Sequence, residues 1–130
     1  MIIDLQVNQG QCTWPELWST AHAADRAGYN TLWIADHLSG SVMNAASMPE
    51  CFATLGALAA VTRNIGLGSL VVNAGLRDPA IVANAAATVQ EISGGRFILG
   101  LGAGASPSSS FASELYAIDA DIPVTMEQRH

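Results

Sequence analysis

Short apolar runs recur along the chain at nearly even intervals. They begin at residues 2, 31, 65 and 96, so that 29 to 34 residues separate successive runs. The first run alternates apolar and polar positions, which is typical of a half-exposed strand. The later three are almost continuously apolar, which is typical of strands buried on both faces in a parallel sheet. The pattern therefore predicts four parallel strands, each followed by a connection long enough to hold a helix.

The segments between the runs predict three helices. Residues 13–16 and 47–50 each place a hydroxyl residue three positions before a glutamate, which is the pattern of a capping box, and residues 78–79 pair an acidic cap with a proline. The ends are expected at Gly28, at Arg63 and Asn64, and at Gly94 and Gly95. Residues 106–123 show no period and predict a long loop, and residues 125–130 suit the opening of a fourth helix.

Alternating strands and helices leave two main architectures, an open doubly wound sheet or a (β/α)8 barrel. The connections after the second and fourth strands are long and polar while the turns before strands are short, as on the two unequal faces of a barrel. The glycines of residues 100–104 do not complete the G-x-G-x-x-G of dinucleotide-binding sheets. We therefore expect the α/β fold of a (β/α)8 TIM barrel, with residues 1–130 forming only its first four βα units, a half-barrel.

Composition and charge exclude several classes of protein. Half of the residues are apolar, so that the chain can bury a core, but no apolar stretch approaches the roughly 18 residues that span a membrane. The net charge is −6, lysine is absent and the arginines are scattered, which argues against a nucleic-acid surface. The amino terminus lacks the pattern of a secretory signal, so that a cytoplasmic location is expected. Cys12 and Cys51 lie in no ligand spacing, and no metal site is expected.

Candidate chemistry gathers where the predicted strands end, because functional groups of parallel α/β folds collect at the carboxyl edge of the sheet. The second strand ends in Asp36 and His37. An imidazole can give or take the proton that accompanies hydride transfer, and an adjacent carboxylate can orient a ligand. A single histidine after a strand is also a common loop residue, so that both interpretations stay open.

The third and fourth strand ends offer weaker candidates. Asn73 can bind a ring edge or a carbonyl through its amide, or can equally satisfy backbone groups at the strand end. Gly102 and Gly104 either form a tight turn or let the backbone approach a flat cofactor. The serines at positions 106, 108, 109 and 110 have no paired base in the sequence, so that nucleophilic catalysis has no support.

A family resemblance extends over most of the chain and is carried by segments whose order and spacing match. They are residues 24–29, 32–38, 55–60, 65–68, 77–80, 86–88 and 92–104. With these segments the chain resembles the luciferase-like monooxygenase superfamily, and within it the oxidoreductases that depend on a flavin or on coenzyme F-420 and are related to methylenetetrahydromethanopterin reductase.

The resemblance implies hydride transfer or monooxygenation of a small-molecule substrate with reduced FMN or coenzyme F-420. It implies that His37 is the active-site histidine near the reactive atom of the cofactor, with Asp36 beside it. It further implies that Leu70 and Val71 form a bulge with a non-proline cis peptide under the central ring, and that Asn73 lines the ring edge.

Two features limit the resemblance. Ala105 and Ser108 stand where the related sugar-phosphate dehydrogenases have an acidic residue and an asparagine, so that this substrate class is not expected. A (β/α)8 barrel needs about 250 residues and binds cofactor phosphate near its seventh and eighth strands. We therefore expect either a missing C-terminal half or a homo-oligomer to complete the barrel. The alternative function is a non-catalytic half-barrel that self-assembles or binds a partner.

Overall fold

Four parallel strands lie side by side in the order in which they occur in the sequence. In the computed structural model, which describes residues 1–104, 106 and 108–117, this sheet has the order β1-β2-β3-β5, and β4 and β6 form a second parallel pair. The strands are β1 (Leu5–Val7), β2 (Thr31–Ile34), β3 (Gly66–Ser69), β4 (Val72–Asn73), β5 (Phe97–Ile98) and β6 (Leu101–Gly102). The helices are α1 (Trp14–Ala27), α2 (Cys51–Val61), α3 (Pro79–Ile92) and α4 (Ala112–Ala117), and 3-10 turns cover η1 (Gln9–Gln11), η2 (Gly40–Met43) and η3 (Ala74–Leu76).

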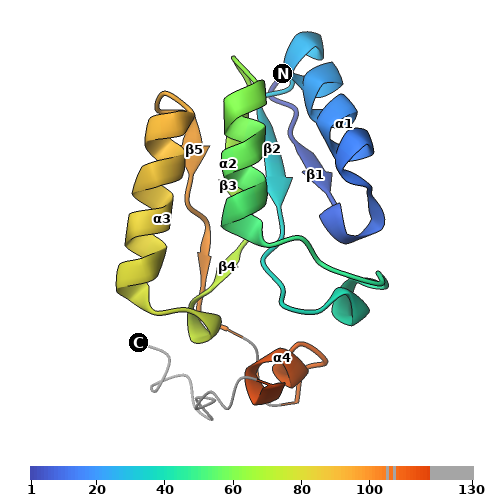
Figure 1. The fold of residues 1–130 in the computed structure, drawn as a ribbon, viewed down its shortest axis with the longest axis vertical. Coiled ribbons are helices and arrows are strands. Elements are labelled where there is room, and N and C mark those ends of the chain that lie inside the picture. The colour runs from blue at the N-terminus through green and yellow to red at the C-terminus, as the bar shows by residue number, and fades with distance from the viewer. Residues whose placement is uncertain (105, 107, 118–130) are drawn as a thin grey trace.

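The three long helices cover the same face of the sheet. Figure 1 shows α1, α2 and α3 side by side, and α2 contacts both of its neighbours. A doubly wound sheet has helices on both faces and a strand order that reverses at a switch point, whereas a barrel is wound in one direction with its helices outside. The expectation of a (β/α)8 TIM-barrel type is therefore confirmed, and the described residues form four strand-led units of it.

The core lies between these helices and the sheet. The α1 helix buries one apolar stripe, formed by Leu17, Ala21 and Ala24. Apolar side chains of the strands pack against it and against α2 and α3, which is how parallel strands under helices become buried. The core residues are Val7, Leu17, Ala21, Ala24, Leu32, Ile34, Cys51, Phe52, Leu55, Leu58, Ala59, Ile65, Leu67, Val72, Val82 and Val89.

Two of the three predicted helix starts are confirmed. Glu16 accepts the backbone N–H of Thr13 at 2.8 Å in a capping box, and Asp78 caps α3 by accepting the backbone N–H of Ala80 at 2.8 Å. The predicted box at residues 47–50 is wrong, because the N-cap of α2 is Glu50 itself, which accepts the N–H of Ala53 at 2.6 Å. A residue before proline avoids the helical conformation, so that the segment ahead of Pro49 stays extended.

The third and fourth apolar runs are each divided into two short strands. The Leu70–Val71 peptide bond is cis and separates β3 from β4, at the position where the family resemblance implies such a bond. At the break, the buried hydroxyl of Ser69 donates to the carbonyl of Gly100 and accepts its N–H, both at 3.0 Å. This side chain supplies the hydrogen bonds that a regular ladder would have made, and the strands resume as the β4–β6 pair.

The amino-terminal ends of the strands are tied together by two charged side chains. The carboxylate of Asp25 accepts the backbone N–H groups of Arg63, Asn64 and Ile65 at 2.7 to 2.9 Å, just before β3. The guanidinium of Arg96, just before β5, donates to carbonyl oxygens of α2, of the loop after it and of its own turn, at 2.6 to 3.1 Å. These bonds fix the turns that lead into the strands.

The expectation of an unbroken loop over residues 106–123 is wrong for its described part. Residues 112–117 form α4, which Figure 1 shows beyond the carboxyl ends of the strands. The short helix is held by tertiary contacts, with Ala112 and Glu114 buried, and such contacts leave no period in so short a segment. Residues 125–130 lie outside the described residues. None of the described helices is long and apolar enough to cross a membrane.

Candidate functional site

A cavity of about 260 Å³ lies at the carboxyl ends of the strands. All of the site residues predicted from the sequence line it, together with Ala103 and Phe111. The lining residues are Asp36, His37, Leu70, Val71, Asn73, Gly102, Ala103, Gly104 and Phe111. The cavity therefore combines the ends of three successive strand-led units with one residue of the segment that precedes α4.

His37 is held from two sides by that late segment. Its Nδ1 atom lies 2.9 Å from Oε2 of Glu114, and its ring stacks on Phe111 with the ring centroids 5.2 Å apart. The side chain of His37 stays partly open, at 19% exposure, whereas that of Glu114 is 1% exposed. The imidazole is thus fixed in plane and direction at the edge of the cavity.

Sequence reasoning missed both partners of His37. Glu114 also accepts the backbone N–H of Ser39 at 2.7 Å, so that each carboxylate oxygen has a donor. A buried carboxylate needs such donors, because taking a charge out of water is costly. The only signal in the sequence is an isolated glutamate in a segment rich in serine and apolar residues.

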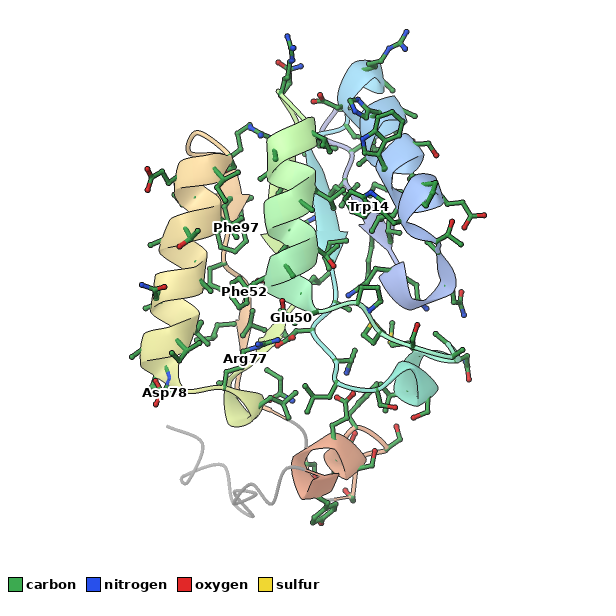
Figure 2. The ribbon with its side chains drawn as sticks, viewed as in Figure 1. Trp14, Glu50, Phe52, Arg77, Asp78 and Phe97 are labelled. Atoms are coloured by element: carbon green, nitrogen blue, oxygen red, sulfur yellow. The ribbon has the colours of Figure 1, made fainter. Side chains whose placement is uncertain are left out.

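Asp36 is turned away from the open side of the cavity and into an ion pair. Its side chain is fully buried, and its two oxygens accept hydrogen bonds from Nη2 and Nε of Arg77 at 2.6 and 3.0 Å. One of them also accepts the backbone N–H of Asn73 at 3.1 Å. Figure 2 shows Arg77 directed toward Glu50, with which it makes a second ion pair at 2.7 Å, and its guanidinium lies over the ring of Phe52.

In this geometry the Asp36 carboxylate supports the cavity wall and is not free to bind a ligand. Because both of its oxygens are occupied, the carboxylate ties the end of β2 to the end of β4 and to the guanidinium of the turn after it. The side-chain hydrogen bond to Asp36 raises the pKa of Arg77, so that the guanidinium stays charged. The sequence alone gave no reason to place Arg77 here, because it is 41 positions away from Asp36.

Cys51 lies next to this ion pair, and its surroundings make its thiol unreactive. Burial raises the pKa of its thiol, and the nearby carboxylates of Asp36 and Glu50 raise it further. A thiolate is the nucleophilic and metal-binding form of cysteine, so that this thiol is poorly suited to either role. Cys12 and Cys51 are both free.

The side-chain amide of Asn73 binds a backbone N–H through its oxygen and leaves its NH2 group available to the cavity. Its Oδ1 atom accepts the N–H of Gly75 at 3.0 Å and caps η3. Within the described part of the chain its Nδ2 group has no hydrogen-bond partner, and this group can donate to a ligand. The two roles that the sequence left open are thus compatible in one side chain.

The glycines keep the cavity open. A Cβ atom at Gly102 would lie 2.6 Å from Cγ2 of Val71, and one at Gly104 would lie 3.2 Å from Oδ1 of Asn73. Gly104 also has a φ of +88°, which side chains other than glycine rarely adopt. Next to Gly102, Leu70 and Val71 are 43% and 40% exposed, so that an apolar surface adjoins the glycine backbone.

A second depression, of about 630 Å³, lies on the outer surface of α1. All of its lining residues come from that one helix, and they include Trp18, His22 and Arg26. The rings of Trp18 and His22 meet edge to face, with centroids 4.4 Å apart. We interpret it as an open groove along a helix, and His22 lies outside the strand-end cavity.

Comparison with known proteins gives one consistent family. A sequence model described as luciferase-like monooxygenase matches residues 3–125. The 5,10-methylenetetrahydromethanopterin reductase of Methanolobus tindarius is 39% identical over 84 residues, which cover 65% of this chain and 23% of the reductase. The chain spans about a quarter of the length of the curated relatives it matches.

Solved structures agree with the sequence comparison. The oxygenating constituent of 3,6-diketocamphane monooxygenase from Pseudomonas putida, in complex with FMN, has a TM-score of 0.69 at 25% identity and covers 85% of this chain and 32% of its own. An F-420-dependent secondary alcohol dehydrogenase in complex with an F-420–acetone adduct has a TM-score of 0.71 at 25% identity, over 79% of this chain and 32% of its own. Both neighbours share the fold described above.

Proposed function

Because the chain belongs to the luciferase-like monooxygenase family, we propose that its strand-end cavity binds the ring system of reduced FMN or of coenzyme F-420 and serves hydride transfer or monooxygenation of a small-molecule substrate. One observation carries the proposal: a fixed imidazole lines a cavity together with exposed apolar side chains and glycine backbone. The relatives add support, because one solved neighbour holds FMN and another an F-420 adduct.

The residues present fit a flat ring. Ligand cavities are mostly apolar with a few placed polar groups, and they usually measure about 300–1,000 Å³. At about 260 Å³ this cavity suits a ring system and not a whole cofactor with its phosphate-bearing tail. Leu70 and Val71 offer an apolar surface for the ring, and the neighbouring backbone at Gly102 carries no side chain that would keep the ring away.

Each polar residue then has a distinct task. His37 holds or moves a proton next to the reacting atoms, and Nδ2 of Asn73 donates to an acceptor on the ring edge. Asp36 does not touch the ligand, because its carboxylate positions the backbone of Asn73 and the guanidinium of Arg77. When bound, the reduced cofactor supplies the hydride or the electrons for oxygen chemistry.

The cofactor phosphate needs groups from elsewhere. Among the described residues the cavity lining contains no arginine, the chain has no lysine, and the guanidinium of Arg77 already binds Asp36 and Glu50. In barrels the phosphate is commonly bound near the seventh and eighth strands. We therefore propose that residues 1–130 act as the N-terminal half of a barrel domain, completed either by a C-terminal half or by a second copy of the chain.

The test is a titration of the 130-residue chain with FMN and, separately, with coenzyme F-420, following cofactor fluorescence, together with the mass of the particle in solution. Saturable quenching by one cofactor supports the proposal and identifies that cofactor. Asn73→Ala should weaken this binding by about two- to tenfold, since a hydrogen bond contributes about 0.5–1.5 kcal/mol. His22→Ala, on the outer groove, is the control and should leave it unchanged. Absence of saturation with both cofactors would contradict ring binding by this chain.

A second candidate is a non-catalytic half-barrel that self-assembles. Ile98, Leu99 and Leu101 are exposed along the β5–β6 edge, next to an apolar hollow of about 220 Å³ against α3. An exposed apolar strand edge is prone to pair with another chain. A defined dimer that binds neither cofactor would favour this function over the first.

A further inference from the structure

The contact between His37 and Glu114 links positions 77 residues apart in the sequence. Oε2 of Glu114 lies 2.9 Å from Nδ1 of His37, and Oε1 accepts the N–H of Ser39 at 2.7 Å. The Glu114 side chain is 1% exposed. The carboxylate therefore has one fixed donor, the Ser39 amide, and its other oxygen faces a ring nitrogen whose role depends on the tautomer.

The chemistry of the two atoms decides which tautomer is stable. An ionised carboxylate only accepts hydrogen bonds, whereas a neutral imidazole has one donor and one acceptor nitrogen. If Nδ1 were the acceptor, two lone pairs would face each other 2.9 Å apart in a buried place. Nδ1 must therefore carry a proton whether the ring is neutral or charged. It follows that Nε2 is the atom that gains and loses a proton.

Phe111 restricts the rotation of the His37 imidazole ring. It stacks on His37 with centroids 5.2 Å apart and an interplanar angle of 23°. Phe111 also lines the cavity, so that the ring is held at the cavity edge and cannot turn without losing this contact. Within the described residues Nε2 of His37 has no hydrogen-bond partner, which leaves it to a ligand.

We propose that Glu114 is a positioning residue that holds His37 in its Nδ1–H form and so commits Nε2 to proton exchange in the cavity. The catalytic meaning of this arrangement rests on the proposed function, but the tautomer does not. Glu114 acts through His37 and does not line the cavity itself. The arrangement places the proton donor and acceptor on one defined atom, which general acid–base catalysis requires.

The variant Glu114→Gln gives a directional test. Its amide offers one oxygen and one NH2 group in place of two oxygens. If the oxygen keeps the N–H of Ser39, the NH2 group faces Nδ1 of His37 and donates to it, which makes Nδ1 an acceptor. The tautomer should then reverse, with the proton on Nε2.

The measurement is a long-range proton–nitrogen correlation spectrum of the histidine side chains in the cofactor-free chain, at a pH where the rings are neutral. The chain has three histidines, and His22 and His130 can be assigned by their replacement with asparagine. We expect the parent chain to show a protonated Nδ1 and an unprotonated Nε2 at His37, and Glu114→Gln to exchange the two signals. The His22 signals should not move in either protein.

Phe111→Leu is the matched control, because it removes the stacking and leaves the carboxylate. It should retain the Nδ1–H form. A parent chain with the proton on Nε2, or with averaged nitrogen signals, would overturn the proposal even if the glutamine variant failed to fold. Equal loss of the Nδ1–H form in Phe111→Leu and Glu114→Gln would also overturn it, since the cause would then be general loosening. Failure of cofactor binding would leave these signals unaffected and would contradict the proposed function alone.

Discussion

Arg77 donates hydrogen bonds to both carboxylate oxygens of Asp36, from Nη2 at 2.6 Å and from Nε at 3.0 Å, at the point where β2 ends. This two-point contact joins two successive strand ends beneath the cavity. Removing one partner of a buried pair leaves the other charge without compensation, which costs about 3–5 kcal/mol.

Asp36→Asn should therefore strongly destabilise the chain. We expect its free energy of unfolding to fall by about 3 kcal/mol in urea titrations. Glu50→Gln is the control at the same guanidinium, because the Glu50 side chain is 46% exposed and the oxygen of a glutamine amide can still accept the N–H of Ala53 at the start of α2. An exposed ion pair contributes about 1 kcal/mol or less. An equal loss of unfolding free energy in the two variants would show that the burial of Asp36 does not determine how much its ion pair stabilises the chain.

Asp25 predicts a dependence of stability on acid pH. Partial burial raises the pKa of its carboxyl group, but the N–H groups of Arg63, Ile65 and Asn64 outweigh this effect, so that the pKa lies below its ordinary value of 3.8. A carboxyl group with a lowered pKa stabilises the fold above its ordinary pKa, and this contribution is lost as the pH falls through the folded-state value. The parent chain should lose this contribution only below about pH 4.

Asp25→Asn should lower the free energy of unfolding by about 1.5 kcal/mol at neutral pH, because its one amide oxygen is a neutral acceptor and its NH2 group would face a backbone N–H that Asp25 accepts. The difference from the parent should shrink as the pH falls below 3.8. Asp78→Asn, at the cap of α3, should change little, because asparagine caps helices as well as aspartate does. Urea midpoints measured from pH 7 downward test both, and a gap for Asp25→Asn that is independent of pH would refute the electrostatic account.

Gly102→Ala should close part of the cavity. The new Cβ would lie 2.6 Å from Val71, so that the wall must shift, at a cost of about 1–3 kcal/mol. The binding of cofactor, read as quenching of its fluorescence, should weaken in the same variant. Gly56→Ala in the middle of α2 meets no atom within 4 Å, and it should stabilise the chain by about 0.5–1 kcal/mol and leave binding intact. Unaltered cofactor binding in Gly102→Ala would remove this backbone from the proposed site.

The two thiols should differ in reactivity. Cys51 is 1% exposed and burial raises the pKa of its thiol, whereas Cys12 is partly exposed. Iodoacetamide at neutral pH should label Cys12 in the folded chain and Cys51 only in denaturant, as read by peptide mass spectrometry. Labelling of Cys51 at the rate of Cys12 without denaturant would indicate that α2 opens readily.

The sequence predicted most of the fold because strands and helices leave local marks. The apolar runs gave the strands, and Thr13 and Asp78 gave two helix starts. The starts and ends that depend on tertiary contacts were not predictable in this way. Glu50 caps α2 while it also binds Arg77, and α4 depends on tertiary contacts that bury Ala112 and Glu114.

The same distinction applies to the site. The side chains at strand ends were found because parallel strands bring their carboxyl ends to one edge. Glu114, Phe111 and Arg77 were missed, because they reach the site through contacts between distant segments and belong to no motif. The Asp36 carboxylate illustrates the limit, since its position beside His37 suggested a ligand contact while its partner lay on another unit.

The hydrogen bonds made by the side chains of Asp25 and Arg96 lie at the opposite end of the sheet from the cavity. Because these bonds fix the turns before β3 and β5, substitutions in the cavity wall leave the supports of the strands unchanged. An engineer could therefore randomise the connections after β2 and β6 to change ligand preference while the other end preserves the strand register. The same separation would let related enzymes acquire new substrates by exchanging loops on one rim alone.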